Sequence, residues 1–233
     1  MENFFEDLYL NGCEIKKNEP MKNHTYFRIG GITQAMLLPK TTEAMVYTCK
    51  KLLLEGKSFR IMGYGANLIV SDRELDFFVI CTKYLSDITF CGTAVTVQCG
   101  APTARLSYMA AQNGLSGLEF ASGIPGSVGG AVFMNAGAYE GEFKNIVRSS
   151  SVFDKKNMEV LSLSTDQMEF GYRKSIFQQG RYICLETNLE LSQAPREEVI
   201  EKTRLLLEKR WKKQPLDLPS AGSFFKRPRN DFF

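Results

Sequence analysis

The sequence of 233 residues lacks several features that define common protein classes. It has one histidine, His24, which excludes a metal site built from several histidines and argues against a histidine-based catalytic triad. Its six cysteines include no C-x-x-C pair and mostly fall inside apolar runs, so we expect buried, reduced thiols and a cytoplasmic protein. The longest apolar run, residues 77–81, is far shorter than the roughly 20 residues that cross a bilayer. The N-terminus also lacks the basic start of a secretory signal, and we expect no membrane association.

An excess of charge of one sign is also missing. The 29 Lys and Arg residues nearly balance 26 Asp and Glu residues, and the net charge is +3. No global field would therefore recruit nucleic acid or anionic lipid. Basic residues do gather at 209–213 and at 226–229, and a solvated helix end is the simpler interpretation of the first group. The remaining composition, 24% charged and 44% hydrophobic, is ordinary for one large globular domain or two small ones.

Apolar spacing predicts a mixture of helices and short strands. We expect helices at 41–57, 103–112 and 195–213, the first two capped by Thr41 and Thr103. The apolar stripe of the last helix would be Val199, Ile200, Leu206, Leu207 and Trp211. Strands are expected at 59–62, 68–70, 77–81, 87–91, 94–99, 147–154, 158–163 and 182–191. This mixed order indicates an α+β fold without internal repeats.

Glycine is concentrated in one part of the chain, since eight of the 19 glycines fall between residues 114 and 141. Successive backbone N–H groups in such a segment can form a nest for an anion, because no side chain keeps the ligand away. For any single glycine a tight turn is the simpler interpretation, but Gly-Ile-Pro-Gly-Ser-Val-Gly-Gly at 123–130 favours a ligand. A second loop, Gly-Tyr-Gly-Ala-Asn-Leu at 63–68, follows a predicted strand, and no G-x-G-x-x-G supports a Rossmann fold. Two such loops would hold a ligand from both sides.

Five motifs, taken together, carry a resemblance to a known family. They are Asn-His-Thr-Tyr-Phe-Arg-Ile-Gly-Gly at 23–31, the loop at 63–68, the glycine-rich segment at 114–139, Phe-Gly-Tyr-Arg at 170–173 and Ser-Ala-Gly-Ser-Phe-Phe-Lys at 220–226. In this order they resemble the UDP-N-acetylenolpyruvoylglucosamine reductase (MurB) family over essentially the whole chain. The resemblance implies a two-subdomain FAD-binding fold of the vanillyl-alcohol-oxidase/PCMH type and the start of a substrate lobe. The expected division is 1–100, 101–194 and 195–233.

The resemblance also implies an activity and its cofactor. The expected reaction is the reduction of UDP-N-acetylglucosamine enolpyruvate, a UDP-sugar enolpyruvyl ether, by NADPH through non-covalent FAD. This reaction serves peptidoglycan synthesis, and through it cell shape and division. A cytoplasmic monomer without metal is implied. The residues expected to hold FAD are Gly63, Tyr64, Gly65, Ala66, Asn67, Leu68, Ser122, Gly123, Ile124, Pro125, Gly126, Ser127, Val128, Gly129, Gly130, Asn135, Ala136 and Gly137.

Two residues are implied to be catalytic. By resemblance, Arg173 binds the substrate carboxylate, whose charge grows as hydride is added, and Ser223 donates the proton. Taken alone, Arg173 would be a surface residue and Ser223 the cap of a turn. Tyr172 and Lys226 are weaker candidates for binding the substrate.

Two departures from the family leave alternatives open. The strand expected at 182–191 is followed almost directly by the helix expected at 195–213. This short connection is typical of the short-looped branch of the family. The sequence ends at Phe233, whereas the family continues into a lobe with a catalytic glutamate, so a flavin-binding protein without efficient reductase activity is the alternative. An oxidase or dehydrogenase of the same fold is a third interpretation. Many of these tether flavin through histidine or cysteine, whereas we expect His24 to lie away from the glycine loops.

Overall fold

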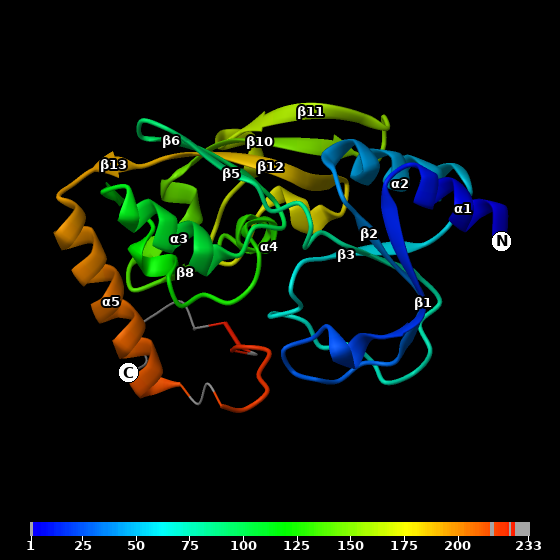
Figure 1. Cartoon of the computed structure of the whole chain (residues 1–233), viewed down its shortest axis with the longest axis horizontal. Coiled ribbons are helices and arrows are strands. Elements are labelled where there is room, and N and C mark those ends of the chain that lie inside the picture. Colours follow the sequence, from blue (N-terminus) through cyan, green and yellow to red (C-terminus); the bar gives the residue numbers. More distant parts are fainter. Residues whose placement is uncertain (1, 215–216, 224, 227–233) are drawn as a thin grey trace.

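Two β-sheets form the frame of the chain, and the first lies in its N-terminal third (Figure 1). The computed structural model describes residues 2–214, 217–223 and 225–226. In pairing order the first sheet contains β1 (Cys13–Pro20), β2 (Ile32–Pro39), β4 (Phe78–Cys81) and β3 (Phe59–Met62). Strand β1 runs antiparallel to β2, while β4 is parallel to both β2 and β3. Helices α1 (Glu2–Leu10) and α2 (Thr42–Leu54) pack against it.

The second sheet is antiparallel throughout and carries the glycine-rich region. Its strands, in pairing order, are β11 (Glu159–Ser164), β10 (Val147–Asp154), β12 (Tyr182–Glu190), β6 (Ala94–Gln98) and β5 (Ile88–Cys91). Its helices are α3 (Thr103–Gln112), α4 (Val128–Phe133) and α5 (Arg196–Lys213). Two small ribbons pair β7 (Leu115–Ser116) with β13 (Ser192–Gln193) and β8 (Gly137–Ala138) with β9 (Gly141–Glu142). The short 3-10 turns are η1 (Met21–Asn23), η2 (Glu119–Ala121), η3 (Phe143–Asn145), η4 (Asp166–Met168) and η5 (Ile176–Gln179).

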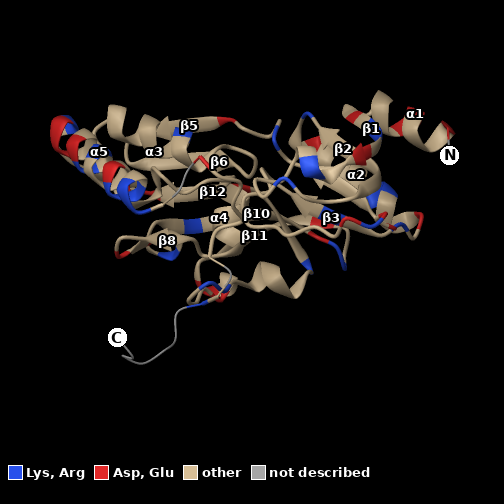
Figure 2. Cartoon of the chain, turned by 90° about the horizontal axis from the view of Figure 1, so that it is seen from below, with Lys and Arg blue, Asp and Glu red and all other residues tan. Residues whose placement is uncertain are grey.

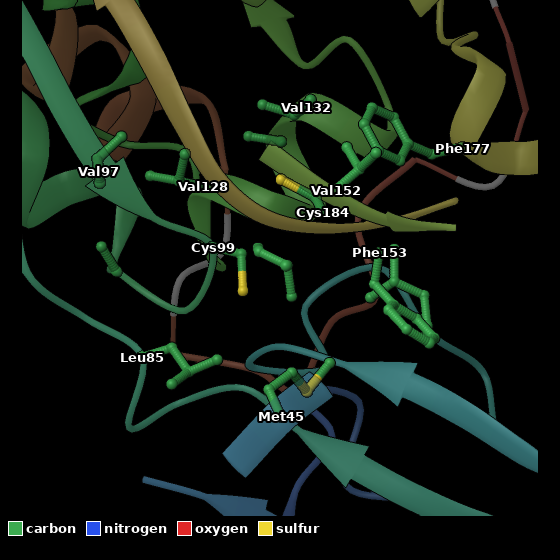
Figure 3. Close-up of a cluster of buried hydrophobic side chains, with 14 of the residues drawn as sticks. Met45, Leu85, Val97, Cys99, Val128, Val132, Val152, Phe153, Phe177 and Cys184 are labelled. Atoms are coloured by element: carbon green, nitrogen blue, oxygen red, sulfur yellow. The ribbon is translucent and has the colours of Figure 1, made fainter. Parts of the chain in front are cut away.

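One apolar core spans both sheets. Figure 3 shows Met45 of α2 facing Leu85, with Cys99, which follows β6, and Phe153 of β10 close by. Met45 and Leu85 are fully buried, and each such side chain contributes about 1.5–3 kcal/mol relative to exposure. The two sheets are therefore held in one position relative to each other by shared packing. Any site between them inherits that rigidity.

The predicted helices are confirmed, and one of them is capped in a different way. The hydroxyl oxygen of Thr41 accepts a hydrogen bond from the Ala44 N–H at 3.1 Å, as a helix cap should. Helix α3 has the predicted bounds, but its N-cap is Pro102. The Thr103 hydroxyl instead donates to the Gly126 carbonyl at 3.0 Å. The side chain expected to cap α3 thus ties that helix to the glycine loop.

The predicted apolar stripe of α5 is only partly correct. Val199 is buried, whereas Trp211 is 61% exposed. The helix packs on α3 and η2, and a buried carboxylate, Glu119, accepts a hydrogen bond from Lys202 at 3.2 Å. Between β12 and α5 the chain has only the two-residue strand β13, so this connection is short, as the sequence predicted (Figure 1).

Other details of the secondary structure were not anticipated. The strand predicted at 68–70 is wrong, because this stretch is an irregular loop in which Ile69 is 56% exposed. The loop nevertheless runs beside the 30–32 segment, where the Gly31 N–H donates to the Ser71 carbonyl at 2.7 Å. Elements α1, β1, β2 and α4 lay outside the predicted set. The division at residue 100 stays a prediction, while the sheets themselves change between β4 and β5.

The cysteines follow the expectation of buried thiols with one exception. Five are buried and unpaired, and Cys91, also unpaired, is exposed at the edge strand β5. None of the helices in the described ranges combines the length and the apolar character needed to pass through a bilayer.

An ion pair between a buried carboxylate and a partly exposed arginine, near the β10–β11 turn, gives a test of this fold. Asp154 is fully buried and accepts hydrogen bonds from Arg181 at 2.9 and 2.6 Å, and this pairing lowers its pKa to about 2. The unfolded carboxyl titrates near ~3.9, so the stabilisation is present above that pH and disappears as the pH falls toward about 2. Since Arg181 is partly exposed, we expect Asp154→Asn to cost about 1–2 kcal/mol at pH 7 in urea unfolding.

The difference between the two proteins should shrink between pH 4 and pH 2 (roughly the interval between the two pKa values). Asp166→Asn, at an exposed position, should change stability little at any pH. A constant difference across the pH range would show that the pair does not supply the effect.

Candidate functional site

The two glycine loops predicted to hold a ligand meet in space. One leaves β3 of the first sheet, and the other leads into α4 beside the second sheet. A Cβ atom added at Gly63 would lie only 2.2 Å from Oγ of Ser127, and one added at Gly126 would lie 3.6 Å from Cβ of Ala66. Because a side chain at Gly63 would collide with Ser127, glycine is required for this approach.

The loop at 123–130 is anchored by its own backbone to the segment between β6 and α3. Val128 and Gly129 donate to the carbonyls of Ala101 and Cys99 at 2.9 and 2.7 Å. The Ser127 hydroxyl caps α4 by accepting from the Gly130 N–H at 3.3 Å. By contrast, within the residues that the structure describes, the N–H groups of Gly126 and Ser127 and those of residues 64–67 donate to no protein acceptor. Rigid loops with unused donors suit an anionic ligand.

The N-terminal motif at 23–31 lies against the first glycine loop. The Tyr26 N–H donates to the Gly65 carbonyl at 3.2 Å, and a Cβ at Gly65 would lie 2.2 Å from the carbonyl oxygen of His24. The expectation that His24 lies away from the glycine loops is therefore wrong. The chain folds back after η1 and brings this distant segment beside the loop. The imidazole itself lies 2.6 Å from the Glu19 carboxylate.

A cavity of about 190 Å³ opens beside this contact. It is lined by Asn23, His24, Thr25, Tyr26, Met62, Gly63, Tyr64, Cys81 and Lys83. Burial raises the pKa of both the Tyr64 phenol and the Cys81 thiol, so both groups are protonated at neutral pH. Ligand sites commonly measure about 300–1,000 Å³, so this cavity would hold one part of a dinucleotide.

Arg173 is held by the backbone of the 135–137 segment. Its guanidinium donates to the carbonyls of Asn135 and Gly137 at 3.3 and 2.7 Å and lies 5.2 Å from the centre of the Tyr172 ring. These two bonds use two of the five guanidinium N–H donors, and three have no acceptor among the described residues. Arg173 itself has a φ of 54°, in the left-handed region. The structure thus fixes a half-buried cation with donors to spare.

Asn135 has a structural task that was not anticipated from sequence. Its fully buried amide donates to Gly171 and Glu142 at 2.9 and 2.8 Å and accepts from the Lys144 N–H at 2.9 Å. These bonds tie the 135–137 segment to the turn that carries Arg173. Asn135, Ala136 and Gly137 stay predicted cofactor residues, although the contacts made by Asn135 and Gly137 serve the position of Arg173. Nothing in the local sequence pattern linked residue 135 with residue 171.

The C-terminal motif returns to the same region. The Ser220 N–H donates to the Tyr26 carbonyl at 3.2 Å, which links the segment at 220–223 to the N-terminal motif. Ser223 and Lys226 are exposed, and among the described residues neither makes a hydrogen bond or ion pair with Arg173. The structure therefore shows no hydrogen bond between Ser223 and Arg173. Residues 224 and 227–233, which include part of the second basic group and of the expected lobe, lie outside the described residues.

The other residues predicted to hold FAD lie along the two glycine loops. Tyr64, Ala66, Ser122, Gly123 and Ile124 are half-buried, while Asn67, Leu68 and Pro125 are exposed. No group of three or more His, Cys, Asp or Glu residues suited to a metal ion occurs in the described part of the chain.

Comparison with known proteins first defines the class. The FAD binding domain family matches residues 33–164, and glucooligosaccharide oxidase from Acremonium strictum shares the fold with a TM-score of 0.61 at 15% identity. That likeness covers 82% of this chain and 43% of the oxidase. The chain has the FAD-binding fold of the vanillyl-alcohol-oxidase/PCMH type, as predicted.

More similar proteins define the family within this class. The UDP-N-acetylenolpyruvoylglucosamine reductase of Petrotoga mobilis is 47% identical over 97% of this chain and 76% of its own length. That of Thermotoga sp. (strain RQ2) is 40% identical, with coverage of 100% and 76%. The crystal structure of MurB from Thermus caldophilus has a TM-score of 0.79 at 30% identity, with coverage of 93% and 76%. The chain belongs to the UDP-N-acetylenolpyruvoylglucosamine reductase family and spans about three quarters of these relatives.

The contact between the loops can be tested at Gly65. This residue has a φ of +67°, and its Cβ would also meet the His24 carbonyl, so Gly65→Ala combines backbone strain with a backbone collision. We expect a loss of at least about 2 kcal/mol in urea unfolding. Gly56→Ala is the matched control, because its φ is +64° and nothing lies within 4 Å of its Cβ. That variant should lose about 1 kcal/mol, and equal losses would contradict the proposed contact.

Proposed function

We propose that this chain is the FAD- and NADPH-dependent reductase that converts UDP-N-acetylglucosamine enolpyruvate to UDP-N-acetylmuramate in peptidoglycan synthesis. The observation that carries the proposal is the arrangement of the family motifs. Two glycine loops meet with unused N–H donors, and a separate turn holds an arginine with free donors. The membership of the family supports the substrate class, since the relatives are named for this substrate.

The residues present fit a flavin nucleotide. The close approach at Gly63 and the unused N–H groups at 64–67, 126 and 127 form a cradle that a Cβ would fill, as a diphosphate requires. We therefore propose residues 63–68 and 122–130 as the FAD-binding loops, with Asn135, Ala136 and Gly137 beside them. When bound, FAD would pass hydride from NADPH to the enolpyruvyl double bond.

Non-covalent binding of FAD is part of the proposal. The imidazole of His24 is engaged with Glu19 at 2.6 Å, and the Cys81 thiol is buried and protonated. Tethering through sulfur proceeds from the thiolate, so a raised thiol pKa disfavours it. Glucooligosaccharide oxidase, which shares only the fold, is described as carrying cysteinyl and histidyl FAD. An oxidase of that kind is thus disfavoured here by what His24 and Cys81 already do.

Arg173 would bind the substrate carboxylate. Its planar fork leaves three donors for two oxygens, and its fixed position means that little reorganisation is needed as negative charge grows on that carboxylate. Ser223 is the proposed proton donor to the substrate carbon, with Tyr172 and Lys226 as substrate-binding residues. Their places beside a bound substrate are proposals carried over from the family motif.

A second candidate is a flavin-binding protein without efficient reductase activity. It is favoured by one observation, the exposure of Ser223 away from any hydrogen bond with Arg173. For the leading candidate we further propose a cytoplasmic location, in keeping with the unpaired cysteines, and a monomeric state that size-exclusion chromatography would test.

The cofactor proposal predicts a coloured protein with releasable flavin. Purified or FAD-reconstituted protein should be yellow, and acid precipitation should leave the flavin in the supernatant, where FAD is identified by chromatography. Flavin that stays in the acid pellet would show a covalent link, and Cys81→Ser would then test the sulfur. A protein that cannot be reconstituted at all would contradict the assignment of the two loops.

The role of Arg173 predicts a difference between the two half-reactions. Arg173→Lys keeps the charge but loses the planar two-point contact, so we expect substrate-driven flavin reoxidation to fall by about 100-fold or more. Flavin reduction by NADPH should change much less, and anaerobic stopped-flow absorbance separates the two. Arg148→Lys, at an exposed position on β10, serves as the matched control. An equal fall in both half-reactions would assign Arg173 to the flavin or NADPH instead.

A further inference from the structure

Arg210, near the end of α5, packs directly on the second glycine loop. A Cβ atom at Gly123 would lie 2.5 Å from Cδ of Arg210, 3.4 Å from its Nε and 3.4 Å from Cδ1 of Leu207. The absence of a side chain at residue 123 therefore makes room for the stem of this arginine. The contact places a cation beside the loop whose Gly126 and Ser127 N–H groups are unused.

The charge of Arg210 has no partner in the described part of the chain. Its Nε atom is buried without a hydrogen bond, and burial lowers the pKa of the guanidinium. Several other charges on α5 are paired, as for Arg204, which bonds with Glu201 and Glu208. Figure 2 shows acidic and basic residues next to one another along this helix. The side chain that acts electrostatically on Arg210 is that of Tyr139, which is a phenol and not a carboxylate. A partly buried, unpaired charge is costly, so it calls for an anion.

The position of Arg210 on the helix does not account for this burial. Cations near the C-terminus of a helix are stabilised by the helix dipole, which is sufficient for the exposed Lys212 and Lys213. An arginine serving only the dipole would extend its head group into water, because a long side chain can do so at little cost. Arg210 instead keeps its Nε against the loop.

We propose that Arg210 binds a diphosphate oxyanion at the loop formed by residues 122–127. The unused N–H groups of that loop and the guanidinium are donors without acceptors, which is the chemistry that recognises phosphate oxygens. The inference rests on the proposed function, which offers two diphosphates, that of FAD and that of the UDP-sugar. The experiment distinguishes them.

The first arm measures flavin affinity of the full chain by fluorescence quenching. Arg210→Met keeps most of the stem but removes the charge, and we expect FAD to bind about 10- to 100-fold more weakly. Riboflavin, which has no phosphate, should lose less than about 2-fold, since Arg210 would not touch its ring. Arg204→Met, on the same helix with the same change, should leave both affinities unaltered.

Thermal unfolding separates a binding role from a structural one. Apo protein with Arg210→Met should unfold at the same or a higher temperature than unaltered apo protein, because an unpaired, partly buried charge has been removed. The increase in unfolding temperature on adding FAD should be smaller for the variant. A lower unfolding temperature of the apo variant would show that Arg210 supports the fold, and the proposal would be overturned.

The second arm titrates UDP into the FAD-loaded protein and follows the flavin absorbance. If Arg210→Met keeps FAD affinity but weakens UDP by about 10-fold or more, the bound diphosphate is that of the nucleotide sugar. Unchanged affinities for both, or an equal loss for riboflavin and FAD, would overturn the proposal. If the unaltered protein binds no FAD, the proposed function fails, and this inference fails with it.

Discussion

The contact between the loop after β3 and the loop before α4 is the constraint on which the rest of the structure depends. At Gly63 there is no space for even one carbon atom against Ser127, so the two loops touch through backbone and a single small side chain. Three further hydrogen bonds hold the second loop in place: Val128 to Ala101, Gly129 to Cys99 and the Thr103 hydroxyl to Gly126. Because one apolar core also joins the two sheets, the two loops keep a fixed position relative to each other. A ligand that contacts both loops meets donors that are already in position.

Near this contact, neutral polar groups fix the position of Arg173 and leave its charge without a carboxylate partner among the described residues. Arg173 is held by two carbonyl oxygens, and the buried amide of Asn135 ties those carbonyls to the turn of the arginine. Neither contact removes its positive charge. Two cations elsewhere are paired with buried carboxylates, Arg181 with Asp154 and Lys202 with Glu119. This contrast supports the proposal that the region between the glycine loops and the 170–173 turn binds anions.

The fold alone does not decide the chemistry. Glucooligosaccharide oxidase shares this fold at 15% identity, while two reductases are 40% and 47% identical to this chain over nearly all of its length. In this chain the single histidine lies beside the first glycine loop, yet it is engaged with Glu19, and the neighbouring Cys81 is buried as a thiol. The frame thus positions a flavin site, and a few side chains within it determine how a flavin would be held and what it would reduce.

Local signals in the sequence were sufficient for the family and for much of the secondary structure. The bounds of α3 and the cap of α2 at Thr41 follow from interactions within a few residues, and the glycine spacing identified both loops. The strand predicted at 68–70 failed because apolar character does not distinguish a strand from a loop that packs beside another segment. Only the tertiary structure brought His24 to Gly65, Asn135 to Gly171 and Arg210 to Gly123. Each of these contacts joins residues far apart in the chain, and its existence depends on how the elements pack, which no local pattern encodes.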